Sequence, residues 1–437
     1  MEAYMIGFTY SQSIQKISRC GAILALVLVF SLISPVLGAG IAITAGDEIM
    51  KTDQLRNLTS GSGQGISVGL ISSGVKHMAD AQKTGDLPPV VHVLKEGKEG
   101  PPDEGTAMLE IIHDIAPNAS LYFSAPGKNE KDFNNAIDSL VDAGCKVLVD
   151  DFGPLAIPYF EDGLNAAHLE EVLLKNPGVV YISAAGNNAQ LHYQGTFSDV
   201  GGGFHSFNGS TGLPLDIQPG GDVGVILQWN DPFNQRVNAY SLYLFDRATG
   251  SEISISERTA NGERRAYEEL RYQNLGDKPV KAEIRVKKVD GSEPNQIELI
   301  FKNNNVNISE GFTVPTDSII GQAAAPSVIS VAAVPAIMAP SIEKFSSQGA
   351  VTMAYPQPAE RKKPDITGLN NVDVTGVGGF QRPFTGTSAA SPHIAGLIAL
   401  EWSLFPQKSG SEIKSAMFQT ATGLGGTGWN PTYGYGL

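Results

Sequence analysis

The chain has 437 residues, of which 42% are hydrophobic and 17% charged, and its 45 acidic and 31 basic side chains give a formal net charge of −14. This composition excludes a disordered or coiled-coil protein, and the negative charge disfavours nucleic acid and anionic membranes as partners. With 49 glycines and 26 prolines, the sequence indicates a loop-rich globular protein that is long enough for two or three domains.

The N-terminal segment has the features of an export signal. Lys16 and Arg19 precede the apolar run GAILALVLVFSLISPVLGAG, which ends in small residues near position 40. This arrangement predicts a signal peptide over residues 1–40 and a secreted or cell-surface protein, with membrane attachment only if the segment stays uncleaved. Cys20 lies inside the signal, so Cys145 is alone in the mature chain and is expected to be a buried thiol without a disulfide partner.

Residues 61–194 alternate short apolar runs with helical patterns. Strands are expected at 65–75, 119–125, 146–153 and 179–187, and helices at 104–117, 133–144 and 163–178. Because each expected strand is apolar through its length, the pattern indicates an α/β fold with a parallel sheet covered by helices on both faces.

The pattern changes between residues 195 and 310. Segments such as DVGVILQWND and VKAEIRVKKVDG alternate apolar and polar residues and are separated by Gly, Asp, Asn and Pro turns, which is typical of a small antiparallel β-sandwich. Within this stretch a helix is expected only at 262–272, GERRAYEELRY. The α/β pattern resumes at 325–334, so we expect an inserted β-sandwich domain at 195–310 between two parts of one α/β domain, 61–194 and 311–437.

A serine stands at the start of an apolar helical pattern in FTGTSAASPHIAGLIALEW. The start of a helix offers unpaired backbone N–H groups and partial positive charge, which stabilise an oxyanion formed beside a nucleophile. The string resembles the nucleophile motif of the subtilisin-like serine peptidases, with Ser388 at the nucleophile position. His393 matches a structural histidine of that family and is expected in the core.

The resemblance extends over roughly residues 61–190 and 315–437. YISAAGNNA resembles the strand end that carries the family's oxyanion-hole asparagine, which corresponds to Asn187. The resemblance implies a subtilisin-like fold and a serine peptidase activity on polypeptide substrates.

The other two positions of the family's catalytic triad differ in this chain. The family has a histidine at the start of a helix and an aspartate at the end of the first strand; Glu104 stands at the first position, and Ser72 and Ser73 stand at the second. His113 lies nine residues after Glu104, and at about 100° per residue it faces the opposite side of the helix. The remaining nearby histidines, His77 and His92, lie on loops that the sequence does not place.

Glutamate at this position resembles the base of the sedolisins, serine-carboxyl peptidases on the same fold. The spacing from Glu104 to Ala116 and Pro117 is similar to theirs, although Met108 stands where sedolisins carry an aspartate. Asn187 is instead a subtilisin-type oxyanion residue. The chain therefore resembles a mosaic of the two families.

A second acid is expected to hold Glu104 and share one proton with it, because coupled carboxyls split their titrations. Asp103, Asp150 and Asp151 are the candidates. Strand alternation puts Asp150 and Asp151 on opposite faces, so only one of them points into the site. VLVDDFG resembles the subtilisin strand that lines the substrate cleft, and its alignment favours Asp151.

Two interpretations stay open at this point. The first is an exported serine endopeptidase in which Ser388 attacks, Glu104 is base and then acid, Asp151 tunes Glu104, and Asn187 holds the oxyanion. Its activity profile is expected to be acid-shifted, because carboxyls titrate near pH 4. The second is a catalytically inactive subtilisin-fold surface or binding protein whose β-sandwich binds a ligand. In both cases we expect a monomer without a cofactor, although turn acids near WNDPFN and LFDRATG could hold structural calcium.

Overall fold

The structure is a computed structural model that describes residues 40–97, 102–256, 262, 264–291, 295–309, 311–337 and 340–437. The expected signal peptide, with Cys20, lies outside these described residues apart from position 40. Among the described residues, no helix is both long enough and apolar enough to cross a membrane.

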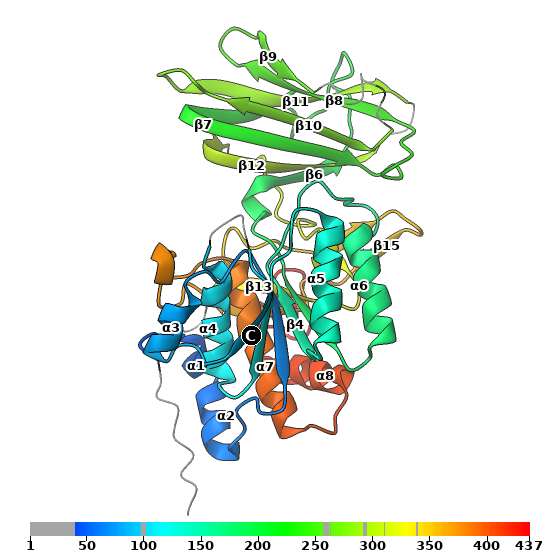
Figure 1. The fold of residues 1–437 in the computed structure, drawn as a ribbon. Helices are drawn as coiled ribbons and strands as arrows, with labels where there is room; N and C mark the ends of the chain where they lie inside the picture. Colours follow the sequence, from blue (N-terminus) through cyan, green and yellow to red (C-terminus); the bar gives the residue numbers. More distant parts are fainter. Residues whose placement is uncertain are drawn as a thin grey trace, which may run out of the picture. The chain divides into compact units, whose positions relative to one another are not determined.

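A seven-stranded parallel sheet forms the centre of the α/β part (Figure 1). Its strands, in spatial order, are β16 (Ile366–Asn370), β13 (Ile329–Pro335), β5 (Val180–Ala184), β4 (Val147–Asp150), β1 (Ser67–Ile71), β3 (Ser120–Ser124) and β2 (Val91–Lys95). Every neighbouring pair in this sheet is parallel. The α/β class with a parallel sheet is therefore confirmed.

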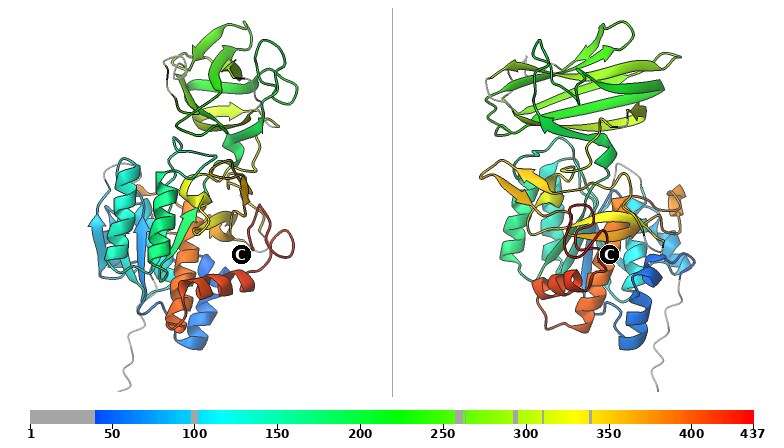
Figure 2. Two further views of the ribbon diagram at one scale, coloured as in Figure 1. Left: turned by 90° about the vertical axis from the view of Figure 1, so that its right-hand side faces the viewer. Right: turned by 180° about the vertical axis from the view of Figure 1, so that it is seen from behind.

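Helices cover both faces of this sheet (Figure 2). Helices α4 (Glu104–Ile115) and α7 (Thr387–Leu404) pack against each other and share one core with Val147 and Val149 of β4. Helices α5 (Glu130–Asp142) and α6 (Leu164–Lys175) share a second core with Leu148 of the same strand. Successive residues of β4 thus face opposite layers, which explains its unbroken apolar sequence.

Smaller elements complete the α/β part. They are α1 (Gly46–Ile49), α2 (Thr52–Thr59), α3 (Met78–Thr84), α8 (Gly410–Thr420), the short 3₁₀ helices η1 (Ala189–Leu191), η2 (Gly321–Ala324) and η3 (Val377–Gly379), and the paired strands β14 (Val351–Met353) and β15 (Ala359–Arg361).

An antiparallel sheet lies between His192 and Ile308 in the sequence. Its order is β6 (His192–Thr196), β12 (Gln296–Ile308), β7 (Leu213–Trp229), β11 (Val280–Asp290), β8 (Ala239–Asp246) and β9 (Glu252–Ile255), and β10 (Tyr267–Gln273) also pairs with β7. Strand β7 pairs with β11 through residues 213–217 and with β10 through residues 222–228, so it changes partners around Pro219. The strands enclose a core of their own, which includes Leu215, Val225 and Trp229.

The helix expected at 262–272 is wrong, because the described residues from Tyr267 onward form strand β10. Leu270 joins the buried core of the antiparallel sheet, and the backbone of β10 pairs with β7. This pairing and burial override the local helical propensity of a Glu- and Arg-rich segment.

Two buried residues have the predicted environments. Cys145 is buried, and desolvation raises the pKa of its thiol to about 12. His393 lies in the core, where its Nδ1 is 2.8 Å from the carbonyl oxygen of Ala389 and its Nε2 is 2.8 Å from the hydroxyl of Thr44. Both are structural residues of the α/β part.

The acids near WNDPFN and LFDRATG are bonded to turns. Asp231 accepts hydrogen bonds from the backbone N–H groups of Val237 and Asn238, and Asp246 accepts them from Ala248 and Thr249. These are the local contacts that aspartate makes in turns. Within the described ranges, no group of His, Cys, Asp and Glu side chains is arranged to hold a metal.

Candidate active site

The nucleophile candidate lies at the start of α7. Gly386 precedes the helix with a φ of 115°, a left-handed conformation that suits glycine, and Ser388 is the second helical residue. In a parallel α/β fold the helices run against the strands, so their N-termini lie at the edge where the strands end. Helix α4 also begins at that edge, with Glu104 as its first residue.

The structure brings Glu104, Ser388 and Asp151 into contact. The carboxyl of Glu104 lies close enough to Ser388 and to Asp151, which directly follows β4, for both to lower its pKa as hydrogen-bond partners. It also accepts a hydrogen bond of 3.3 Å from the hydroxyl of Ser73, which follows β1. Residues far apart in the sequence thus meet because the strand ends and helix starts share one edge of the sheet.

Burial controls the charges of the two acids. Desolvation raises the pKa of Asp151 well above its usual value, and the nearby charges of Glu104 and Asp150 raise it further. Desolvation also raises the pKa of Glu104, but the hydrogen bonds from Asp151, Ser73 and Ser388 oppose that increase. These causes favour a shared proton on Asp151 and a charge on Glu104. The N-terminus of α4 favours the same negative charge.

The serines at the end of β1 contact both acids of this pair. Ser72 donates a hydrogen bond of 3.2 Å to Oδ2 of Asp151, while Ser73 donates to Glu104. Ser72 is buried, so its hydroxyl gives Asp151 a polar partner in a dry environment.

The other two acid candidates have different partners. Asp103 is buried and binds His77, with its Oδ1 2.6 Å from the backbone nitrogen of that residue. Asp150 is buried on the opposite side of β4, where its Oδ1 accepts from Ser183 and Gln322, each at 3.1 Å. Burial raises the pKa of Asp150 to about 7. Of the three candidates, Asp151 is the one that contacts Glu104.

The nearby histidines lie away from this cluster. His113 is buried on α4, and desolvation lowers its pKa to about 4. His77 is bound to Asp103, and His92 stacks on Tyr122 with ring centroids 4.5 Å apart. In the part of the chain that the structure describes, the carboxyl of Glu104 is the titratable group that contacts Ser388.

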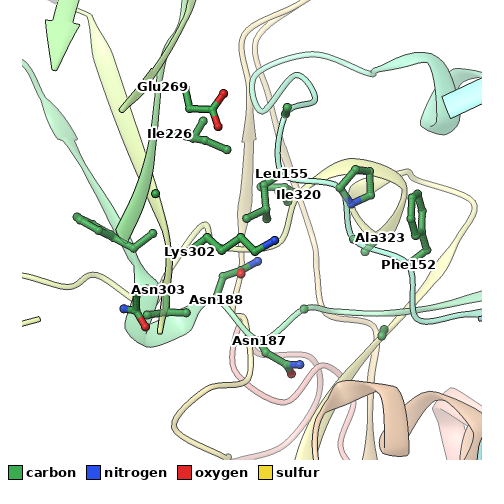
Figure 3. Close-up of a pocket in the computed structure, with 18 of the residues that line it drawn as sticks. Phe152, Leu155, Asn187, Asn188, Ile226, Glu269, Lys302, Asn303, Ile320 and Ala323 are labelled. Carbon is green, nitrogen blue, oxygen red and sulfur yellow. The ribbon is translucent and has the colours of Figure 1, made fainter. Parts of the chain in front are cut away.

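Asn187 is held beside the nucleophile by its oxygen. Its Oδ1 accepts hydrogen bonds from the backbone nitrogen and the hydroxyl of Thr387, both at 3.0 Å. Because the oxygen is occupied, the side-chain NH₂ remains the donor that this exposed residue offers to the cleft. Asn187 and Ser388 both line a cavity of about 980 Å³, in which Figure 3 shows the side chain of Asn187.

Sequence reasoning missed the far wall of this cavity. Residues of β7, β10 and β12 line it opposite the loop that follows β4. No local signal in the sequence shows where an inserted segment docks, because docking depends on the strand register and on the packing of distant residues.

Comparisons with known proteins concern the fold of this chain. Residues 303–436 match the sequence profile of the subtilase family. The solved structure of the CspB protease of Clostridium perfringens is similar to this chain with a TM-score of 0.58 and 15% identity, over 90% of this chain and 94% of that one. The chain therefore has a subtilisin-like fold, and its C-terminal part carries the subtilase sequence profile.

Other solved structures resemble this chain more distantly. A lanthipeptide protease has a TM-score of 0.44 and 15% identity, with 90% of this chain and 89% of that chain covered. For sphericase the values are 0.45 and 15%, with 91% and 97% covered. A search of curated proteins finds no match. At 15% identity the CspB structure shows the subtilisin-like fold alone.

Proposed function

We propose that this subtilisin-like chain is an exported serine endopeptidase in which a carboxylate, not an imidazole, activates the nucleophile. The observation that carries the proposal is the hydrogen-bonded series Ser388–Glu104–Asp151. A serine hydroxyl needs a base within hydrogen-bond reach, and Glu104 supplies one at the start of a helix.

The proposed reaction proceeds in two stages. Ser388 Oγ attacks the peptide carbonyl while its proton passes to the carboxylate of Glu104. Glu104 then gives this proton to the leaving amine, the C–N bond breaks, and an acyl-enzyme remains. In the second stage water gives its proton to Glu104, attacks the ester and releases the acid, and the proton returns to Ser388.

Two further groups assist this chemistry. Asn187 Nδ2 and the backbone N–H of Ser388 would donate to the oxyanion, because a helix N-terminus and a fixed amide stabilise negative charge there. Asp151 would keep its proton and donate a hydrogen bond to Glu104, which holds that carboxylate ionised despite its burial.

The environment of Glu104 sets the acid side of the pH profile. Glu104 must be ionised to act as base, so activity is lost as the pH falls through its pKa in the folded protein. Burial raises that pKa above 4.5, so the loss should begin at a higher pH than for a free glutamate. The profile should still lie below that of an enzyme with a histidine base.

Export and assembly are proposed from the sequence. The N-terminal segment, residues 1–40, has the charge and apolar pattern of a secretory signal, which supports a secreted or cell-surface protein. We propose a monomer that acts on polypeptides and needs no cofactor for catalysis.

The deciding experiment replaces Glu104 by Gln. Glu104→Gln keeps the hydrogen-bonding shape but cannot accept the proton, so kcat should fall by about 10²–10⁴-fold. Glu171→Gln, an exposed glutamate on α6 that pairs with Lys175, is the matched control and should keep full activity. A rate maximum at pH 8 to 9 that survives Glu104→Gln contradicts the carboxylate mechanism.

A labelling experiment separates this proposal from an inactive binding protein. A fluorophosphonate should form an adduct at Ser388 in the purified wild-type protein and not in Ser388→Ala. Absence of any adduct between pH 3 and pH 8 would support the alternative, a subtilisin-fold binding protein that uses its β-sandwich.

A further inference from the structure

The antiparallel sheet presents one face to the cavity that contains Ser388. Paired residues of neighbouring strands lie on the same face, and Gly224 of β7 pairs with Arg271 of β10 on one side and with Lys302 of β12 on the other. Val223 and Val225, on either side of Gly224, are buried in the sheet's own core. The row Arg271–Gly224–Lys302 therefore lies on the opposite face.

Cross-strand rows that lie closer to the loop after β4 hold this face of the sheet against that loop. Ile226 and Ile300 pack against Ile157 and Tyr159 in one buried cluster. Gln228 is also buried; its Nε2 donates to the carbonyl of Ile157 at 2.6 Å, and its Oε1 accepts from the backbone nitrogen of Tyr159 at 3.2 Å. A buried amide that satisfies two backbone groups holds the sheet in a defined position.

The neighbouring row, Arg271–Gly224–Lys302, faces the cavity instead of packing against the loop after β4. All three residues of the row Arg271–Gly224–Lys302 line the cavity of about 980 Å³, as do Ser388 and Asn187. A side-chain carbon added at Gly224 would meet its nearest neighbour, the carbonyl oxygen of Lys302, only at 3.6 Å. The missing side chain thus leaves a trough between two basic residues.

The two cations of this row differ in their partners. The guanidinium of Arg271 forms an ion pair of 2.5 Å with Glu269, so its charge is largely compensated. Lys302 is exposed, and no carboxylate among the described residues pairs with it. Figure 3 shows its side chain extending from β12 into the cavity. The cavity is also lined by the acids Asp151, Asp222 and Glu269, and Lys302 is a cation among them that an acidic group of a ligand can pair with.

We propose that Lys302 selects peptide substrates with an acidic side chain close to the scissile bond. The substrate carboxylate would lie in the trough above Gly224 and accept hydrogen bonds from the ammonium of Lys302, with Arg271 beside it. This inference rests on the proposed peptidase function, because it assigns a substrate class to the same cleft. The inserted sheet would then be a wall of the substrate site and not a separate binding module.

The test compares fluorogenic peptides that differ only by Glu, Gln or Lys at each position around the cleaved bond. At one position the wild-type protein should prefer Glu by about three- to tenfold in kcat/KM, a range set by one charge-assisted bond at a partly exposed site. Lys302→Gln should bring the ratio close to one, and Lys302→Glu should favour Lys at that position. Lys281→Gln, an exposed lysine of β11 outside the cavity, should keep the wild-type ratio.

Binding to an inactive protein separates this proposal from the peptidase proposal. In Ser388→Ala, a labelled Glu peptide should bind more tightly than its Gln partner, and adding Lys302→Gln should remove the difference. If the wild-type protein cleaves nothing but this difference persists, the peptidase proposal fails and the selectivity proposal stands. Cleavage without a Glu preference, or equal binding of both peptides, overturns the selectivity proposal.

Discussion

The role of Asp151 can be tested by two substitutions that separate its hydrogen bond from its charge. Asp151→Asn keeps an acceptor oxygen for Ser72 and an NH₂ donor for Glu104, but cannot ionise. Asp151→Leu has a similar shape without any donor and keeps the site dry. In the proposed mechanism Asp151 is a protonated donor, so the two variants should differ strongly.

The expected size of the effect follows from the contacts of Glu104. Its carboxylate accepts hydrogen bonds from Asp151, Ser73 and Ser388, and each of them lowers its pKa against the burial that raises it. A hydrogen bond to a charged group stabilises by about 1.5–3 kcal/mol, and about 1.4 kcal/mol corresponds to one pKa unit. Loss of the Asp151 donor should therefore raise the pKa of Glu104 by about 1–2 units.

The assay is the pH dependence of kcat/KM. Glu104 is active when ionised, so a higher pKa moves the acid limb of the profile to higher pH in Asp151→Leu. Asp151→Asn should keep the limb near its wild-type position. If Asp151 were instead ionised in the wild-type protein, it would repel the charge on Glu104 and raise its pKa. Both variants would then move the limb to lower pH, and that result would refute the assignment of the proton.

Two further predictions concern stability. Burial raises the pKa of Glu110 to about 7, so its contribution to the free energy of unfolding is lost as the pH rises from about 4.5 through 7. Glu110→Gln keeps both hydrogen bonds to Thr375 and should remove this loss, which is of the order of 3 kcal/mol. Urea unfolding of the wild type and the variant at pH 5 and pH 8 measures it. An unchanged pH dependence of the unfolding free energy in the variant would argue against this role of Glu110. In Gly368→Ala the added carbon would lie 2.3 Å from the backbone oxygen of Ala390. Thermal unfolding should show a loss of about 1–3 kcal/mol, whereas Gly178→Ala, which meets no atom within 4 Å, should change little.

The sequence predicted those parts of the fold that depend on local periodicity. Strand β4 is apolar at every position before its terminal aspartate because Val147 and Val149 face one helical layer and Leu148 faces the other. The same alternation predicts that Asp150 and Asp151 point to opposite faces, and the structure places them on opposite sides. Local rules were sufficient for this strand because neighbouring residues determine which face each side chain takes.

Long-range pairing limited the prediction elsewhere. Segment 262–272 has helical propensity, but β7 offers it hydrogen bonds and a core, and part of it becomes strand β10. The row Arg271–Gly224–Lys302 depends on the register of three strands that are far apart in the sequence. A register is fixed by packing and not by composition, so no sequence motif could show that these residues line the cavity with Ser388.

The contacts of Ser72 and Ser73 change the interpretation of these two residues. As changes from the family's acidic position they favour a loss of catalysis, but they are bonded to Asp151 and Glu104. An aspartate at this strand end would bring a third carboxyl against a half-buried pair of acids, and mutual repulsion would raise all three pKa values. A hydroxyl instead donates to a carboxylate without adding charge. A glutamate base whose acid partner, Asp151, directly follows β4 is therefore compatible with serine at the end of β1. Met108 is fully buried in the core, which leaves Asp151 as the acid partner within reach.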